Sequence, residues 1–385
     1  MLPAAARLLA LPLALLSAAV GRADERPNVV LIFCDDLGYA DVGFNGGEDV
    51  KTPNLDALAA GGTVCSSGYV AHPFCGPSRM ALMAGRYPHL FGGPYNLPNA
   101  GEGIEEYNRL GLPPGETTVA TTLQTAGYRT GVVGKWHMGI DAPYHPNARG
   151  FDEFYGFLGG GHAYFPNRYR PIYERQKANG AQTFNDYILP LERNGEEVRE
   201  TEYLTDAFSR EAAKFVTESA AGDAPFFLYL SYNAPHTPLE AKDDLALFGH
   251  IEDEDRRTYA TMVYAVDRGV GELVAALREA DEFENTLIVF LSDNGGKLGA
   301  GADNTPLKQG KGSVYEGGVR VPMLWHQPGV VPAGRVYEHP VSAIDFYPTF
   351  ARLAEADVPA SQPLEGVDVW DGLLSGRPAR DEAPI

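Results

Sequence analysis

The stretch Asn28-Val-Val-Leu-Ile-Phe-Cys-Asp-Asp36 joins a continuous apolar run to two carboxylates. A run of this kind is typical of a strand buried on both faces, as in a parallel sheet that helices cover. Four more apolar segments, at residues 128–133, 225–232, 286–292 and 319–325, predict further strands of the same sheet. The first run therefore predicts an α/β fold with a largely parallel sheet.

Helices are predicted between these strands. Three of them begin near a proline or threonine and end at a glycine, and two are longer and amphipathic. Their expected ranges are 53–61, 77–85, 118–127, 203–219 and 255–281. Regular alternation of strands and helices is typical of a sheet with a helix layer on each face.

Between about Gly139 and Glu200 the alternation stops, and the sequence becomes rich in Gly, Pro, Tyr, Asn and Arg. This segment includes Gly159-Gly160-Gly161. A long irregular stretch inside a compact domain usually has a functional role. We therefore expect loops and short elements around a pocket.

Composition excludes some classes of protein. The 385 residues are 44% hydrophobic and 21% charged, as in a packed globular protein rather than a disordered one. With 31 Lys and Arg against 51 Asp and Glu, the formal charge of -20 argues against a nonspecific nucleic-acid surface. An anionic small substrate would need a local cationic pocket.

Residues 1–23 are expected to form an export signal, because Arg7 precedes the apolar run Leu8–Val20 and small residues stand at Gly21 and Ala23. The run of 13 apolar residues is too short for a typical membrane span, although an uncleaved N-terminal anchor is the alternative. We expect an exported, periplasmic or secreted protein with no integral membrane span. Its three cysteines are too few for a disulfide scaffold.

Polar side chains follow two of the expected strands. Asp35 and Asp36 end the first, and Asp293 and Asn294 follow the segment 286–292. Ligands of open α/β sheets lie at the carboxyl ends of the strands, and hard oxygen donors suit Ca²⁺ or Mg²⁺. Asp and Asn are also common in turns, so either pair alone has a structural interpretation.

A further cluster of chemically active residues lies in Cys75-Gly-Pro-Ser-Arg-Met-Ala-Leu-Met-Ala-Gly-Arg86. Cys75 precedes an expected helix start, where free backbone N–H groups favour an anion or an activated nucleophile. Arg79 lies one turn into that helix. A lone cysteine at such a position is otherwise a small apolar residue, and this is our interpretation of Cys34 and Cys65 unless they form a disulfide.

The same stretch resembles the C-x-P-S-R-x-x-x-L-x-G-R signature of the type I, formylglycine-dependent sulfatases, with Leu82 one place early. The stretch Gly127–His137 is similar to their G-Y-x-T-x-x-x-G-K-x-H signature at every fixed position. The resemblance covers most of residues 27–350 and is to arylsulfatase and N-acetylgalactosamine-6-sulfatase types. It implies an alkaline-phosphatase-like fold, with a large mixed, mostly parallel sheet between helix layers and a catalytic domain at residues 24–360.

The resemblance also implies a mechanism. A formylglycine-generating maturation enzyme would oxidise Cys75 to an aldehyde whose hydrate has two hydroxyls. One hydroxyl would attack the sulfur of a sulfate ester, forming a covalent sulfoenzyme and displacing the alcohol. Deprotonation of the second hydroxyl would then expel sulfate and restore the aldehyde.

Roles for individual residues follow from the same resemblance. The cation, Ca²⁺ or alternatively Mg²⁺, would bind the modified Cys75 together with four side chains, Asp35, Asp36, Asp293 and Asn294. Two lysines would hold sulfate oxygens, one arginine would support the diol, and two histidines would move protons. These residues are Lys135, Lys311, Arg79, His137 for the second hydroxyl and His236 for the leaving alcohol. His162, in the glycine-rich segment, is either a substrate contact or an ordinary loop histidine.

The sequence thus predicts an exported, calcium-dependent sulfatase that acts on a carbohydrate or aryl sulfate. The alternatives are a formylglycine-dependent phosphonate or phosphodiester hydrolase and a noncatalytic metal- or glycan-binding homologue. The family resemblance also implies a smaller C-terminal subdomain with an antiparallel sheet, so we expect residues 361–385 to be the start of a truncated C-terminal region.

Overall fold

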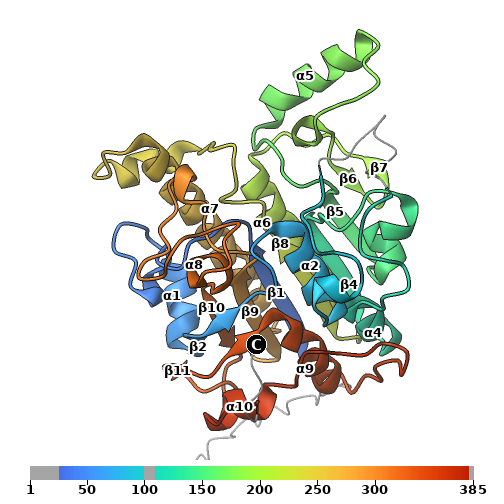
Figure 1. Cartoon of the computed structure of the whole chain (residues 1–385), viewed down its shortest axis with the longest axis vertical. Coiled ribbons are helices and arrows are strands. Elements are labelled where there is room, and N and C mark those ends of the chain that lie inside the picture. Colours follow the sequence, from blue (N-terminus) through green and yellow to red (C-terminus); the bar gives the residue numbers. More distant parts are fainter. Residues whose placement is uncertain (1–25, 99–108, 381–385) are drawn as a thin grey trace, which may run out of the picture.

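The computed structural model describes residues 26–98 and 109–380 (Figure 1). The export signal expected at residues 1–23 lies outside this range. Strand β1 (Asn28–Cys34) lies at the centre, and every residue in it is buried. The predicted apolar strand is confirmed.

Ten strands of the described residues form one sheet. Besides β1 they are β2 (Thr63–Cys65), β4 (Arg129–Lys135), β5 (Glu153–Phe157), β6 (Glu192–Arg193), β7 (Glu196–Glu197), β8 (Phe226–Ser231), β9 (Thr286–Ser292), β10 (Met323–His326) and β11 (Arg335–Tyr337). Their order is β11-β2-β10-β9-β1-β8-β4-β5-β6-β7. The central strands β9, β1, β8, β4 and β5 are parallel, whereas β10 runs antiparallel to β9. A separate pair consists of β3 (Gly68–Tyr69) and β12 (Val341–Ser342).

Helices cover both faces of the sheet. Alternate residues of β1 point to opposite faces: Val30 and Ile32 belong to one apolar core, and Leu31 and Phe33 to the other. The first core is covered by α1 (Pro53–Ala60), α6 (Leu204–Ala220) and α7 (Glu254–Glu279), and the second by α2 (Cys75–Ala84), α4 (Val119–Thr125), α9 (Phe346–Leu353) and α10 (Trp370–Ser375). The predicted mixed, mostly parallel sheet between helix layers is confirmed.

Short 3-10 helices link these elements. They are η1 (Gly43–Asn45), η2 (Pro88–Leu90), η3 (Ala142–Tyr144), η4 (Pro146–Arg149), η5 (Asp186–Ile188), η6 (Asp243–Phe248), η7 (Leu298–Ala300) and η8 (Ala343–Asp345).

The strand expected at residues 319–325 is wrong in its first half. The segment begins at the end of α8 (Glu316–Val319), and β10 starts only at Met323. Just before β10 the backbone contacts β3 instead of β9: the Val321 N–H donates to Gly68 O at 2.9 Å, and Arg320 forms an isolated antiparallel bridge with Tyr69. Pro322 has no N–H to donate. Apolar, β-branched composition therefore overstated the length of this strand.

The segment 139–200 is more regular than its composition indicates. Strand β5 pairs in parallel with β4, and α5 (Pro166–Ala178) is a helix of 13 residues that projects from the upper end of the molecule (Figure 1). Pro171 inside α5 concealed this helix, because an interior proline removes a backbone hydrogen bond. The expectation of loops and short elements is wrong for the 13-residue α5, whereas the five-residue β5 is one of the short elements expected.

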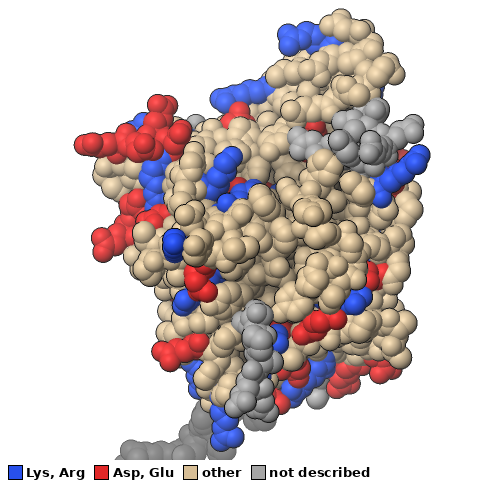
Figure 2. All heavy atoms as spheres, in the orientation of Figure 1, with Lys and Arg blue, Asp and Glu red and all other residues tan. Residues whose placement is uncertain are grey.

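Residues 361–380 pack against the main domain. Trp370 and Leu373 of α10 are buried in the second core, and the Arg335 guanidinium donates to Leu374 O at 2.8 Å. Figure 2 shows Asp and Glu side chains gathered at a projecting corner and, mixed with Lys and Arg, along the lower edge of this face. Among the residues that the structure describes, no helix has the length and apolar character needed to cross a bilayer.

Candidate active site

Four central strands deliver polar residues to one edge of the sheet. Strand β1 leads into Asp35 and Asp36, and β9 leads into Asp293 and Asn294. The loop after β8 carries His236, and β4 ends in Lys135 and is followed by His137. All of these residues are buried. The structure therefore brings together side chains that are far apart in the sequence, as the rule for carboxyl ends of parallel strands predicts.

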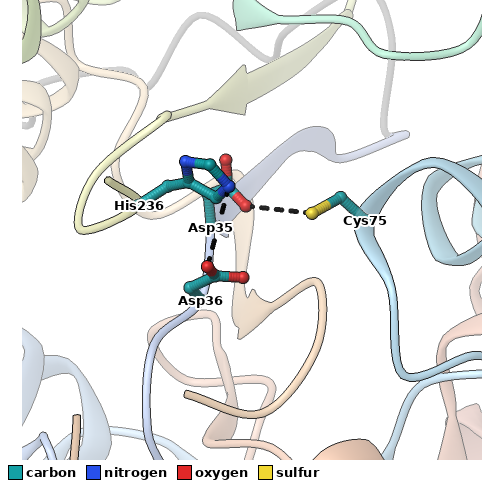
Figure 3. A group of neighbouring side chains, drawn as sticks. All are labelled: Asp35, Asp36, Cys75 and His236. Atoms are coloured by element: carbon teal, nitrogen blue, oxygen red, sulfur yellow. Dashed lines mark hydrogen bonds and ion pairs between the residues drawn. The ribbon is translucent and has the colours of Figure 1, made fainter. Parts of the chain in front are cut away.

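Four side chains form the centre of this cluster: Asp35, Asp36, Cys75 and His236 (Figure 3). One potential ligand atom from each lies within 4.8 Å of the others. The Cys75 thiol donates to Asp35 Oδ1 at 3.4 Å, and His236 Nε2 lies 3.7 Å from Asp36 Oδ2. The cluster has the donors and the spacing of a metal site.

Two lysines neutralise the central carboxylates. Lys135 Nζ donates to Asp35 Oδ2 at 2.7 Å, and Lys311 Nζ lies 2.7 Å from Asp36 Oδ1 and 3.2 Å from Cys75 Sγ. Burial alone would raise the pKa of Asp36, but Lys311 and His236 outweigh it and lower that pKa to about 2. Asp36 is therefore ionised, and the Lys311 ammonium is held beside the cysteine, while Lys135 shares the Asp35 carboxylate with it.

Arg79 and Asp293 form a fully buried ion pair. Arg79 Nε and Nη2 donate to Asp293 Oδ2 at 2.9 and 2.7 Å, and Arg79 Nη1 donates to Ser231 Oγ at 2.5 Å. Burial and repulsion from Asp35 raise the pKa of Asp293 to about 6 despite Arg79. Arg79 thus lies behind the carboxylates and compensates their charge.

Asn294 provides an independent sign that a cation fits here. Its Nδ2 donates to Asp36 Oδ1 at 2.7 Å, whereas its buried Oδ1 has no hydrogen-bond partner among the residues that the structure describes. A buried, unpartnered oxygen is costly unless another group satisfies it. Carboxylate and amide oxygens are donors that hard divalent cations prefer. The residues therefore fit the divalent metal of the predicted site, and His236 lies next to them.

Both predicted site histidines are neutral under ordinary conditions. His236 Nδ1 donates to Thr237 O at 2.6 Å, so the neutral ring has its free nitrogen, Nε2, on the Asp36 side. Burial lowers the pKa of His236 to about 4. Burial, with Lys135 and Arg79, holds the pKa of His137 well below its ordinary value. Each ring can accept a proton only when a negative charge is brought close.

Cys75 begins α2 and is buried, and it forms no disulfide with the described residues. Burial, reinforced by Asp293 and Asp35, raises the pKa of this thiol well above its ordinary value. The unmodified side chain is therefore a thiol rather than a thiolate.

Close backbone packing explains the glycine that precedes Lys135. A Cβ on Gly134 would lie 1.9 Å from Ser231 O, and Gly134 has a φ of 110°. Gly156, its register partner on β5, is equally crowded, because a Cβ there would lie 1.9 Å from Gly134 O. Only glycine allows the strands to approach this closely and hold Lys135 at the site.

His162 has a structural environment. Its ring nitrogens lie 2.7 Å from the carbonyl oxygens of Ala163 and Leu189, and its ring packs edge-on against Tyr169. It ties two loop segments together. Asp186 and Tyr187 lie nearby, and no motif in the sequence marks them. The run of three glycines that packs against them is their signal.

A mostly parallel sheet with helices on both faces, and with a buried carboxylate, lysine and histidine cluster at its carboxyl edge, defines a hydrolase of the alkaline-phosphatase-like class. The sulfatase family model matches residues 27–356. The chain therefore belongs to the sulfatase family and is a sulfuric ester hydrolase.

Individual relatives and solved structures resemble this chain over most of its length. N-acetylgalactosamine-6-sulfatase of Canis lupus familiaris is 33% identical over 364 residues, which cover 92% of this chain and 67% of the relative. The crystal structure of Ps i-CgsB in complex with k-i-k-neocarrahexaose is 57% identical with a TM-score of 0.91, covering 94% of this chain and 79% of that chain. PsFucS1 sulfatase from Pseudoalteromonas sp. is 28% identical with a TM-score of 0.73, covering 92% and 74%.

Proposed function

We propose that this protein removes sulfate from a sulfated carbohydrate after conversion of Cys75 to formylglycine. The observation that carries the proposal is the position of Cys75, whose sulfur lies 3.2 Å from Lys311 Nζ and 3.4 Å from Asp35 Oδ1 in a buried site. A protonated thiol there is a poor nucleophile, whereas the hydrated aldehyde would supply a hydroxyl to attack sulfur.

The substrate class rests on Ps i-CgsB, which was crystallised with a neocarrahexaose, a hexasaccharide. Because the identity to Ps i-CgsB is 57%, its ligand favours a carbohydrate sulfate over an aryl sulfate, although the sequence motifs allow both. We infer a sulfated oligosaccharide as the substrate of this chain. We further propose export to the periplasm or medium, as Arg7 and the apolar run Leu8–Val20 indicate.

The cationic side chains would bind the sulfate group. Lys135 donates to Asp35 and Lys311 donates to Asp36, and sulfate oxygens could accept the remaining hydrogens of both ammonium groups. Arg79 is fully engaged with Asp293 and Ser231, so it holds the site in shape and offsets its acidic charge. These three cations only balance the three carboxylates that they contact, so the positive charge that would capture an anion, despite the formal net charge of -20, would come with the bound divalent cation.

A divalent cation, Ca²⁺ or alternatively Mg²⁺, would complete the site. We propose that its protein ligands are Asp35, Asp36, Asp293, Asn294 and the modified Cys75. When bound, the cation would lower the pKa of the attacking hydroxyl and neutralise charge on the sulfate. The unpartnered Oδ1 of Asn294 supports this ligand set.

Protons would pass through the two histidines. His236 would donate one to the leaving alcohol, and His137 would remove one from the second hydroxyl of the modified Cys75. Because burial lowers the pKa of His236 to about 4, the imidazolium form needs the negative sulfate group beside it. Protonated His236 becomes scarcer as the pH rises, so turnover of alcohol esters should decline toward alkaline pH.

The test begins with protein made together with a formylglycine-generating enzyme. We expect the mass of the peptide that contains Cys75 to match formylglycine, and we expect the protein to release sulfate from k-i-k-neocarrahexaose. Matched aryl sulfate, phosphate and phosphonate esters are compared in parallel. Unmodified cysteine after this treatment, or faster phosphonate than sulfate turnover, contradicts the proposal.

Replacing His236 should affect substrates according to their leaving group. A sugar alcohol needs a proton as it leaves, whereas 4-nitrophenolate does not, so we expect His236→Gln to lower kcat/KM for the hexasaccharide by about 10²-fold or more and for 4-nitrophenyl sulfate by less than about tenfold. Steady-state kinetics on both substrates measure this. His250→Gln, at an exposed position, is the control. Equal losses on the two substrates would exclude the assigned acid.

Removal of the cation should abolish turnover and lower the melting temperature. A ligand that binds only the folded state stabilises it by about 2.7 kcal/mol at a concentration 100 times its Kd. After chelation, we expect added Ca²⁺ to restore both properties and Asn294→Ala to weaken the thermal shift. Asn179 is exposed at the end of α5, so Asn179→Ala should show the same thermal shift as the protein without a substitution. An unchanged shift in Asn294→Ala would remove Asn294 from the ligand set.

A further inference from the structure

The three consecutive glycines of the irregular segment each pack against a different side chain near the site. A Cβ on Gly159 would lie 2.9 Å from Asp186 Oδ2, and one on Gly160 would lie 2.9 Å from His137 Nε2. A Cβ on Gly161 would lie 2.5 Å from Tyr187 Cζ. The glycine run is thus shaped to fit His137 on one side and the Asp186-Tyr187 pair on the other.

The backbone of Tyr187 is anchored from several directions. Its N–H donates to Asn185 Oδ1 at 2.9 Å, and its carbonyl accepts from the Ala163 N–H at 3.0 Å. Asp186 Oδ2 accepts from the Gly160 N–H at 3.1 Å, which ties this turn to the glycine run. Asp186 is buried, and its Oδ1 has no hydrogen-bond partner within the described part of the chain. These contacts fix the backbone of Tyr187, and the close approach of Gly161 limits where its ring can lie.

The ring of Tyr187 faces the site. Its centroid lies 6.3 Å from that of His236. Burial raises the pKa of the phenol, and Asp35 raises it further while Lys311 lowers it, so the hydroxyl experiences the charges of the site. Tyr187 is only half-buried, and its hydroxyl makes no hydrogen bond with the described residues. An anchored aromatic side chain with an unpaired hydroxyl is suited to hold a ligand.

We propose that Tyr187 is a specificity-determining residue that contacts the sugar carrying the scissile sulfate. Its ring would pack on the C–H face of the sugar, and its hydroxyl would bond to a ring substituent. Because His236 lies beside it, the sugar oxygen would be held near the leaving-group acid. This inference rests on the proposed function, since it assumes that a sulfated sugar enters this site.

The first test compares two substrates. We expect Tyr187→Ala to lower kcat/KM for k-i-k-neocarrahexaose by about tenfold or more, mainly through KM, with less than about a threefold change for 4-nitrophenyl sulfate. Tyr187→Phe should recover the part of the loss that is due to the ring. Tyr264→Ala is the matched control, because Tyr264 is also half-buried but packs against Phe248. Equal losses on both substrates, or none, would overturn the proposal.

The second test uses the glycine that touches the ring. Gly161 does not have a positive φ, so Gly161→Ala should fold, yet its Cβ would push Tyr187 aside. We expect this variant to reproduce the selective loss, and to add nothing when Tyr187→Ala is already present. Additive losses would mean that Gly161 acts elsewhere and would count against the assigned contact.

A binding measurement separates this inference from the proposed function. In a Cys75→Ala background, which lacks the reacting group, Tyr187→Ala should weaken hexasaccharide binding about tenfold by titration calorimetry. An unchanged Kd, or no hexasaccharide binding at all, overturns the inference whether or not the enzyme is active. Selective binding by a protein that releases no sulfate would instead contradict only the catalytic proposal.

Discussion

Cys75→Ala is expected to abolish sulfate release while leaving the fold intact. Alanine fits at the start of α2 and removes only a buried sulfur, so the melting temperature should change little. Loss of a nucleophile typically costs activity by several orders of magnitude, and we expect a fall in kcat of at least about 10⁴-fold. Sulfate release from k-i-k-neocarrahexaose measures the effect.

Cys65→Ala is the matched control. Cys65 is also a buried, free cysteine, but it lies in β2 and only burial perturbs its thiol. We expect this variant to keep most of its turnover. If Cys75→Ala retained even about a hundredth of the activity, the reaction would have to use a different nucleophile.

Arg79→Met is expected to have the largest effect on stability. Arg79 and Asp293 are both fully buried, and removing one partner of such a pair typically costs about 3–5 kcal/mol because the other charge is left uncompensated. The free energy of unfolding, measured in urea with the chelated protein, should fall by this amount. The comparison variant is Arg352→Met, whose ion pairs with Asp368 and Asp371 are exposed and worth about 0–1 kcal/mol.

The loss in Arg79→Met should also depend on pH. The pKa of Asp293 is already raised to about 6, and it rises further without the arginine. A carboxyl pKa that is higher in the folded than in the unfolded state costs stability as the pH rises. The deficit should therefore be larger at pH 8 than at pH 5. A deficit as small as that of Arg352→Met at both pH values would show that another group compensates Asp293.

The sequence predicted the centre of the fold well, because local pattern determines it. The run Asn28–Cys34 is apolar throughout, and the ends of parallel strands meet at one edge, so the carboxylates that follow β1 and β9 were expected to lie together. In the structure the Asp36 N–H donates to Asp293 Oδ1 at 3.3 Å. Lys311 was placed by family resemblance alone, since nothing in its local sequence distinguishes it from a surface lysine.

Other features depend on contacts that a sequence does not reveal. Helix α5 contains Pro171, which lowers local helix propensity, so its formation could not be read from pattern. Tyr187 reaches the site only because three glycines make room for it and for its neighbours. The roles of such residues follow from long-range packing rather than from composition.

The burial of Cys75 determines whether its conversion comes before or after folding. Only 1% of this residue is exposed once α2 lies against the sheet, so an oxidising enzyme cannot bind the Cys75 side chain in the folded protein. The proposed conversion then has to take place while the segment is still extended. Maturation and folding would compete for the same interval, and a chain that folds too soon would be stable, correctly shaped and permanently inactive.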